Sequence, residues 1–232
     1  MTYIRSLIVK NIMNRVLFFS LLLSSLCLNA ADLTAKIAKQ DPPKELSEPI
    51  RQLLDSKAIQ VVESGKPKFE YWFVKEVPLK AKPASREKAL DSLEQTTLIG
   101  AVKVGEDSRD YRDDELPAGV YTMRFALQQQ DGNHLGSTEF LYFLVLVPAK
   151  SDTKPDGLNT YKSLVKASAR DTSNEHPLVV SLRPASGDAG ENPEIKEPAP
   201  ELKSVLLKLP AKAGTEKATL PFEIVCEGHF TK

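Results

Sequence analysis

Cysteine and histidine are scarce in this sequence. The chain of 232 residues has two cysteines and three histidines. Cys27 lies in an apolar segment near the N-terminus, so Cys226 has no intramolecular partner once that segment is removed, and stability from a disulfide framework is excluded. Cys226 ends the apolar run Phe222–Cys226, which favours a small buried side chain over a nucleophile.

Motifs of the common enzyme classes are also missing. The sequence holds no glycine-rich phosphate loop, no zinc-finger or haem-attachment spacing and no Gly-x-Ser-x-Gly turn. We therefore assign no catalytic residue and no cofactor-binding loop, and favour a protein that is not an enzyme. The 31 basic and 31 acidic side chains are not gathered into a basic stripe, which argues against nucleic acid as a partner.

The N-terminal 30 residues differ in composition from the rest of the chain. Three basic residues precede an apolar run, Val16–Leu28, and small residues follow it near Ala30; the basic residues are Arg5, Lys10 and Arg15. This order predicts a secretory signal peptide over residues 1–30, and hence a periplasmic or extracellular location. The run is shorter than the roughly 20 residues that span a bilayer, so we expect no transmembrane segment in the mature chain. Removing residues 1–30 would leave a net charge of −3.

Short apolar runs separated by turn-forming residues make up the remainder. Residues 31–44 are polar and contain Pro42-Pro43, which predicts a flexible N-terminal tether. We expect residues 45–232 to form a single domain, mainly β: an antiparallel, immunoglobulin-like β-sandwich with one or two short helices. Gly100, inside the strand-like run 97–104, indicates a bulge or a close backbone approach.

The most regular pattern is a hairpin around residues 115–147. Val120 to Gln128 alternate with period two, which predicts that one strand face is buried, and Phe140–Val147 is apolar throughout, which predicts an inner strand covered on both sides. The expected core residues from the two runs are Tyr121, Met123, Phe125, Leu141, Phe143 and Val145.

Two resemblances follow from these runs. Leu116-Pro117-Ala118-Gly119-Val120-Tyr121 resembles the corner of fibronectin type III and related immunoglobulin-like sandwiches, in which a tyrosine hydroxyl bonds back to the corner backbone. The runs WFVKEVPL, TLIGAV, DYRDDELPAGVYTMRF and DGNHLGSTEF, in that order, resemble uncharacterised secreted proteins of planctomycete-type bacteria over about residues 45 to 230. The first resemblance implies an architecture, and neither implies an activity.

The three histidines are the candidate metal ligands. His134, His176 and His229 each lie in a turn beside a predicted strand and could bind Zn²⁺ or Cu²⁺ if the turns met. They would share one end of the fold if the strands containing Tyr121 and Leu220 ran parallel and the strand after Pro177 ran opposite to both. The alternative is three unrelated surface histidines, which the lack of a metal-binding spacing favours.

The sequence therefore favours an exported, non-catalytic β-sandwich module that binds a protein or small-molecule ligand through its loops. The alternative is a metal-binding protein or metal-dependent enzyme that uses the three histidines. A third possibility is a carbohydrate-binding module, which requires exposed aromatic platforms; the candidates are Trp72, Tyr111 and Tyr142.

Overall fold

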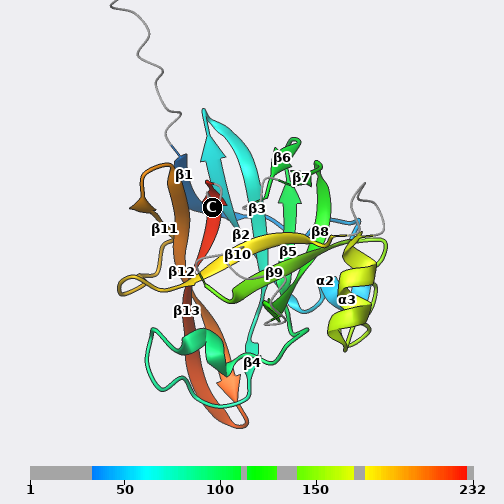
Figure 1. The fold of residues 1–232 in the computed structure, drawn as a ribbon, viewed down its shortest axis with the longest axis vertical. Coiled ribbons are helices and arrows are strands. Elements are labelled where there is room, and N and C mark those ends of the chain that lie inside the picture. The colour runs from blue at the N-terminus through cyan, green and yellow to red at the C-terminus, as the bar shows by residue number, and fades with distance from the viewer. Residues whose placement is uncertain (1–32, 111–113, 130–139, 170–175, 229–232) are drawn as a thin grey trace, which may run out of the picture. The chain divides into compact units, whose positions relative to one another are not determined.

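A curled antiparallel sheet makes up most of the described chain (Figure 1). The computed structural model describes residues 33–110, 114–129, 140–169 and 176–228. In chain order the elements are β1 (Leu33–Lys39), α2 (Glu48–Arg51), β2 (Leu54–Glu63), β3 (Lys66–Val74), β4 (Val77–Leu79), the 3-10 helix η1 (Ala89–Ser92), β5 (Leu98–Val104), β6 (Ser108–Arg109), β7 (Glu115–Leu116), β8 (Gly119–Leu127), β9 (Tyr142–Pro148), α3 (Tyr161–Ser168), β10 (Leu178–Pro184), β11 (Glu194–Ala199), β12 (Leu202–Ala213) and β13 (Glu216–Glu227). The prediction of a mainly β chain with short helices is confirmed.

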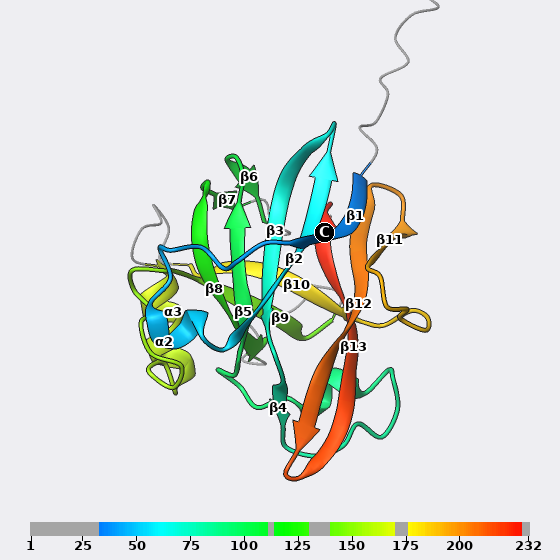
Figure 2. The same cartoon turned by 180° about the vertical axis from the view of Figure 1, so that it is seen from behind.

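The strands of the main sheet follow one continuous path, β1-β2-β3-β5-β8-β9-β10-β13-β12-β11, and β4 pairs in parallel with β12 beside this path. β10 belongs to both halves of the path, because its first part, 178–181, pairs with β9 and its last part, 182–184, pairs with β13. The two outermost strands, β1 and β11, contact each other. The sheet therefore curls around one large apolar core, and Figure 2 shows the same arrangement from behind.

The N-terminal part of the described chain is a strand, which corrects the prediction of a flexible tether over residues 31–44. β1 pairs antiparallel with β2 along its whole length, from Leu33 opposite Glu63 to Lys39 opposite Lys57. Apolar residues alternate with polar ones from Leu33 to Ile37, a pattern that suits a partly buried edge strand. The prolines that suggested a tether, Pro42 and Pro43, come only after this strand ends.

The β8–β9 hairpin is buried on both faces, by different partners. Phe125 pairs with Leu144 and faces the large core, whereas Phe143 and Val145 belong to a second apolar cluster beneath α3. The expectation that β9 is an inner strand covered on both sides is confirmed. The predicted core set needs one correction, because Leu141 precedes the first residue of β9 and is 44% exposed.

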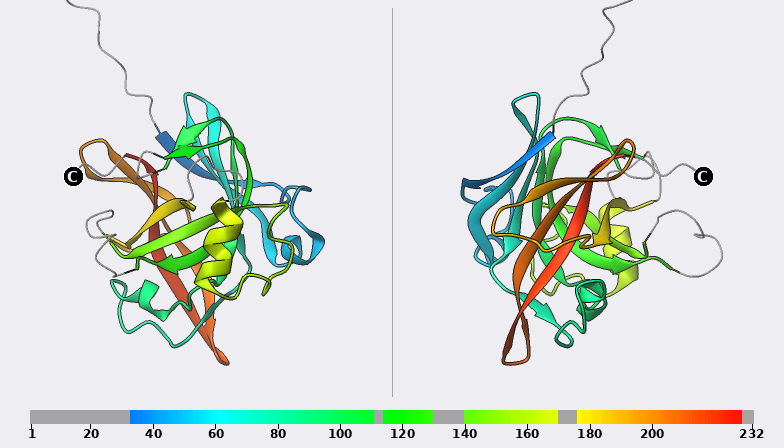
Figure 3. Two further views of the ribbon diagram at one scale, coloured as in Figure 1. Left: turned by 45° about the vertical axis from the view of Figure 1, so that its right-hand side comes forward. Right: turned by 90° about the vertical axis from the view of Figure 1, so that its left-hand side faces the viewer.

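Three segments cover different parts of the outer face of this sheet. The segment between β1 and α2 crosses one part (Figure 2), where the indole Nε1 of Trp72 donates a hydrogen bond to the carbonyl oxygen of Gln40 at 2.9 Å. The loop between β9 and α3 and the helix α3 cover the part near β9 (Figure 3). The N-terminus of α3 is closed by a capping box between Thr160 and Ser163.

Gly100 lies at a point where two neighbouring backbones approach closely. A Cβ atom there would lie 2.2 Å from the carbonyl oxygen of Trp72 on the neighbouring strand. The register between β5 and β8 also shifts between Leu98 and Gly100. Both expectations for this glycine, a bulge and a close backbone approach, are confirmed, and only glycine fits the gap.

Candidate functional site

The candidate site is a surface pocket of about 530 Å³ between the loop 80–88 and β13. The loop contributes Lys82, Pro83, Ser85 and Arg86, and β13 contributes Lys217, Ala218, Thr219 and Pro221. We call these eight residues the basic pocket. Its volume lies in the range typical of small-molecule sites, and its lining combines apolar residues with polar and charged ones.

The basic pocket rests on a framework that is anchored at both ends. Before the loop, β4 pairs with residues 211–213 of β12. The amide of Lys80, the first residue of the loop, donates to the carbonyl oxygen of Ser92 (2.8 Å) and joins the two ends. After the loop, the buried residues Ala89 and Leu90 of η1 pack into the core. The loop is therefore fixed at both ends. In Figure 1 this loop lies beside the lower part of the long β12–β13 hairpin.

Three cations line the basic pocket, and they are not equally neutralised. Lys82 Nζ lies 2.6 Å from Glu216 Oε1, and Arg86 Nη1 lies 2.6 Å from Asp188 Oδ1. Within the part of the chain that the structure describes, the side chain of Lys217 makes no ion pair or hydrogen bond, and the buried Nε of Arg86 has no acceptor. The pocket is therefore cationic, with donor capacity left over for a ligand.

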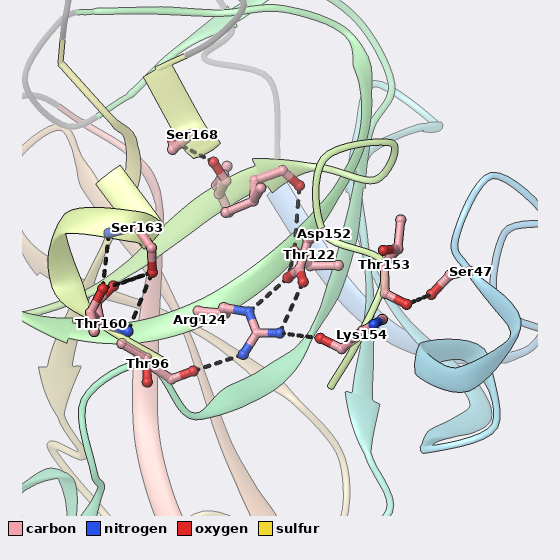
Figure 4. Close-up of polar contacts among 12 residues, drawn as sticks. Ser47, Thr96, Thr122, Arg124, Asp152, Thr153, Lys154, Thr160, Ser163 and Ser168 are labelled. Carbon is pink, nitrogen blue, oxygen red and sulfur yellow. Dashed lines mark hydrogen bonds and ion pairs between the residues drawn. The ribbon is translucent and has the colours of Figure 1, made fainter. Parts of the chain in front are cut away.

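A second polar cluster is fully enclosed beneath the loop between β9 and α3 (Figure 4). Arg124 binds both carboxylate oxygens of Asp152, at 2.7 and 2.9 Å, and Thr122 Oγ1 donates to the same carboxylate at 2.6 Å. Arg124 also donates to the carbonyl oxygens of Thr96 and Lys154, both at 2.9 Å. The side chains of Arg124 and Asp152 are 2% and 0% exposed, so this cluster fixes the loop to the sheet and offers nothing to a ligand.

The candidate metal ligands are only partly described. His176 is exposed and lies just before β10, whereas His134 and His229 are outside the described residues. No group of three His, Cys, Asp or Glu side chains that could hold a metal ion occurs among the residues that the structure describes. The three-histidine site itself therefore stays a prediction.

The strand directions do not meet the condition that would gather the three turns. β8 and β10 both run antiparallel to β9, so they point the same way, and β13 runs antiparallel to β10. The end of β8 and the start of β10 therefore lie at opposite ends of the sheet. The end of β13 lies near the start of β10. One part of the condition is met, because the strand after Pro177 runs antiparallel to the strand of Leu220. The other part is not met, because β8 and β10 run the same way and β8 is therefore antiparallel to β13.

The structure describes two of the three aromatic candidates for a carbohydrate-binding platform. Trp72 is fully buried, which excludes it as a platform. Tyr142 is partly buried, its ring stacks on Phe125 at a centroid distance of 6.4 Å, and its hydroxyl donates to Asp91 at 2.6 Å. Tyr111 lies outside the described residues. In the described part of the chain, aromatic rings thus serve the core rather than a flat sugar-binding surface.

Cys226 behaves as the sequence predicted. It is buried and forms no disulfide. Burial raises the pKa of its thiol to about 12, and the nearby Glu227 carboxylate acts in the same direction. A thiol that stays protonated at neutral pH is a poor nucleophile, which supports a packing role.

The sequence analysis did not predict the basic pocket, because neither the loop nor β13 has a distinctive sequence by itself. Residues 76–96 have no consistent apolar stripe that would place the loop. The lining residues of β13 lie more than a hundred residues after the loop. One usable signal was present: four cations, Lys80, Lys82, Arg86 and Lys88, fall within nine residues that contain a single acid, Glu87. The chain has no net charge, so such a local excess marks a candidate anion site.

Comparison with protein-family models, curated proteins and solved structures found no match to this chain. No helix in the described residues is long and apolar enough to cross a membrane. The resemblances drawn from the sequence therefore stay predictions. One contact expected from the first is present, since the Tyr121 hydroxyl donates to the carbonyl oxygen of Pro117 at 2.8 Å.

Proposed function

We propose that this protein is an exported, non-catalytic binding module with an immunoglobulin-like architecture, and that its ligand occupies the basic pocket. The observation that carries the proposal is the pocket itself, with three cations beside apolar residues and one side built by a loop with joined ends. Lys82 and Arg86 contact carboxylates at the surface, and no histidine or carboxylate is among the eight lining residues to activate the hydroxyls of Ser85 and Thr219, which suits binding better than covalent chemistry.

Support for the architecture comes from two features. The bond from Tyr121 to Pro117 ties the start of β8 to its own corner, as in immunoglobulin-like sandwiches. The last four strands lie in the spatial order β10-β13-β12-β11, in which three hairpin-linked strands follow one that is connected to them by a longer segment, a Greek key read from its other end. Support for export comes from residues 1–30, whose removal places the mature chain in a periplasmic or extracellular setting.

The proposed site is tested by blocking it. Thr219 is exposed and lines the pocket, so Thr219→Trp should fill the space without disturbing the core. Thr34→Trp is the matched control, because Thr34 is an exposed strand threonine that does not line the pocket. The probes are a fixed panel of neutral, cationic and anionic saccharides, short peptides and organic acids, and binding is followed by backbone amide chemical shifts.

We expect at least one member of the panel to shift the amide signals of residues 82–86 and 217–219 in a saturable way. Binding should persist in Thr34→Trp and disappear in Thr219→Trp. If nothing in the panel binds, or if whatever binds does so equally in both variants, the basic pocket is not the binding site of this module.

The metal-binding alternative is proposed only as far as its residues allow. It requires His134, His176 and His229 to share an ion, and the strand directions described above do not favour this. Calorimetric titration of Zn²⁺ and Cu²⁺ into metal-free protein at neutral pH decides it. Equal, weak binding by wild type and His134→Ala would exclude the site.

A further inference from the structure

We propose that the ligand of the basic pocket is a small organic dianion, an apolar carbon frame carrying two carboxylates, and that Glu216 and Asp188 occupy the places of those carboxylates in the free protein. The inference rests on the proposed function and adds the chemistry of the ligand to it. Four observations carry it: the local charge, the exposure of the two built-in acids, the unused donors and the shape of the lining.

The end of the molecule that holds the pocket is strongly cationic. The loop contributes Lys80, Lys82, Arg86 and Lys88, and the tip of the β12–β13 hairpin adds two lysines, Lys212 and Lys217. Four acids oppose them: Glu87, Asp91, Glu216 and Asp188. Six cations against four acids leave a net excess of two positive charges, which attracts an anion to this end and raises its local concentration.

The two built-in acids are held only weakly. The side chain of Asp188 is 100% exposed and that of Glu216 is 56% exposed. Ion pairs in such settings contribute little, because water screens the charges and ordering two long side chains costs entropy. A ligand can therefore replace both carboxylates one for one, so that each cation exchanges one anionic partner for another.

Two donor groups of the pocket, the ammonium of Lys217 and Nε of Arg86, have no carboxylate partner among the residues that the structure describes. Lys217 lies directly opposite Lys212 in the β12–β13 ladder, and like charges at directly opposed positions destabilise a sheet. The Nε of Arg86 is buried with no acceptor in the described chain, although a buried donor normally has a partner. A ligand carboxylate beside Lys217 would reduce the repulsion between the two lysines. A ligand carboxylate beside Arg86 would give its Nε an acceptor.

The lining argues for a small molecule with an apolar frame. Pro83, Ala218 and Pro221 supply carbon surface between the cations, and a volume of about 530 Å³ accommodates one compact ligand. A long polyanion such as nucleic acid would need cations in a continuous track, and here they are confined to one end of the fold. Two acidic groups joined by a short hydrocarbon fit these constraints.

The test compares adipate, a dicarboxylate, with adipamide, its neutral isostere, by amide chemical shifts and calorimetry. Adipate should bind saturably and shift the signals of residues 82–86 and 217–219, and its affinity should fall as salt is raised from low to physiological concentration. Adipamide should not bind. Lys217→Gln should weaken adipate binding severalfold.

Removing the charge of Glu216 or Asp188 tests whether these acids compete with the ligand. Glu216→Gln and Asp188→Asn each remove a competitor, so each should bind adipate about two- to fivefold more tightly than wild type does. Glu194→Gln is the matched control: Glu194 forms an equally short exposed pair with Lys196 on β11, away from the pocket, and its loss should leave adipate binding unchanged.

Failure of this inference can be told apart from failure of the proposed function. Equal binding of adipate and adipamide, unchanged affinity in Glu216→Gln and Asp188→Asn, or binding of heparin without adipate would overturn the dianion. If some other panel member still bound in a manner abolished by Thr219→Trp, the basic pocket would remain the binding site. Loss of that dependence would overturn both.

Discussion

The same chemistry, a basic side chain against a carboxylate, is used in two opposite ways in this molecule. Arg124 and Asp152 are 2% and 0% exposed and make a two-pronged contact that ties a loop to the sheet. Lys82 and Glu216 are 61% and 56% exposed at the rim of the basic pocket. A buried pair must stay intact, because either partner alone would be an unpaired charge without water, whereas an exposed pair can open at little cost. The first kind serves the fold, and the second is free to serve binding.

The largest expected effect comes from breaking the buried pair. Asp152→Asn leaves the Arg124 charge uncompensated inside the protein and should lower the free energy of unfolding by about 3 to 5 kcal/mol, measured by urea denaturation at pH 7. Asp188→Asn, the same change in a pair whose carboxylate is fully exposed, should leave the free energy of unfolding nearly unchanged.

A second substitution, Thr122→Val, tests the same buried cluster if Asp152→Asn does not fold. Thr122→Val removes only the hydroxyl that donates to Asp152, and should cost about 1.5 to 3 kcal/mol because the acceptor is charged. Losses below about 0.5 kcal/mol for Thr122→Val would mean that the cluster does not hold the loop.

The opposite face of the same strand offers an apolar counterpart. Phe125 is fully buried in the large core, next to Arg124 in sequence but on the other side of β8. Phe125→Ala should cost about 3 to 5 kcal/mol of unfolding free energy through lost burial and the cavity left behind. A change within about 0.5 kcal/mol would contradict the face assignment of β8.

A third, smaller effect concerns pH. Burial raises the pKa of Cys226 to about 12, from 9.0. In the unfolded chain the thiol ionises first, so the stability associated with Cys226 is fully present below pH 9 and is lost as pH rises from 9 toward 12. Wild type should therefore lose stability between pH 8 and pH 10.5 more steeply than Cys226→Ala, whatever the offset between them at pH 7.

Tyr142, whose pKa is also raised to about 12, ionises in the same pH range, but it does so in both proteins and cancels from the comparison. Parallel stability curves for wild type and Cys226→Ala would show that the thiol is not held in its neutral form by the fold.

The smallest effect is expected at the surface pair. A double-mutant cycle of Lys82→Gln and Glu216→Gln should give a coupling free energy below about 1 kcal/mol, and 1 M NaCl should remove most of it. A coupling above about 2 kcal/mol would show that this pair is structural, and would remove the contrast with Arg124 and Asp152.

Much of the fold followed from local sequence patterns. The uniformly apolar run before Pro148 and the isolated Gly100 predicted what the structure has, because such signals act over neighbouring residues. The period-two run at Tyr121 correctly predicted a strand with Met123 and Phe125 in the core, but it predicted one buried face and β8 is buried on both. The error at Leu141 concerned a strand boundary: the apolar run begins at Phe140, but β9 begins only at Tyr142 and leaves Leu141 outside the strand.

The buried charges and the basic pocket could not be read in this way. Arg124 sits in an alternating strand, where it was expected to face solvent; it is buried because a loop that contains Asp152 folds over it. The pocket combines residues 82–86 with residues 217–221, and the parallel pairing of β4 with β12 that brings them together left no trace in the local pattern. Both depend on contacts between segments distant in sequence.

The division of β10 between two neighbours bears on how the chain reaches its native state. Hairpins such as β2–β3, β8–β9 and β12–β13 join strands that are adjacent in sequence, so they can form early and quickly. The pairing of Leu182 with Ile224 closes a long loop and must wait for the last strand of the chain to be made. This step is expected to come late: substitutions at Leu182 and Ile224 should have φ-values near zero, accelerating unfolding while leaving the folding rate almost unchanged.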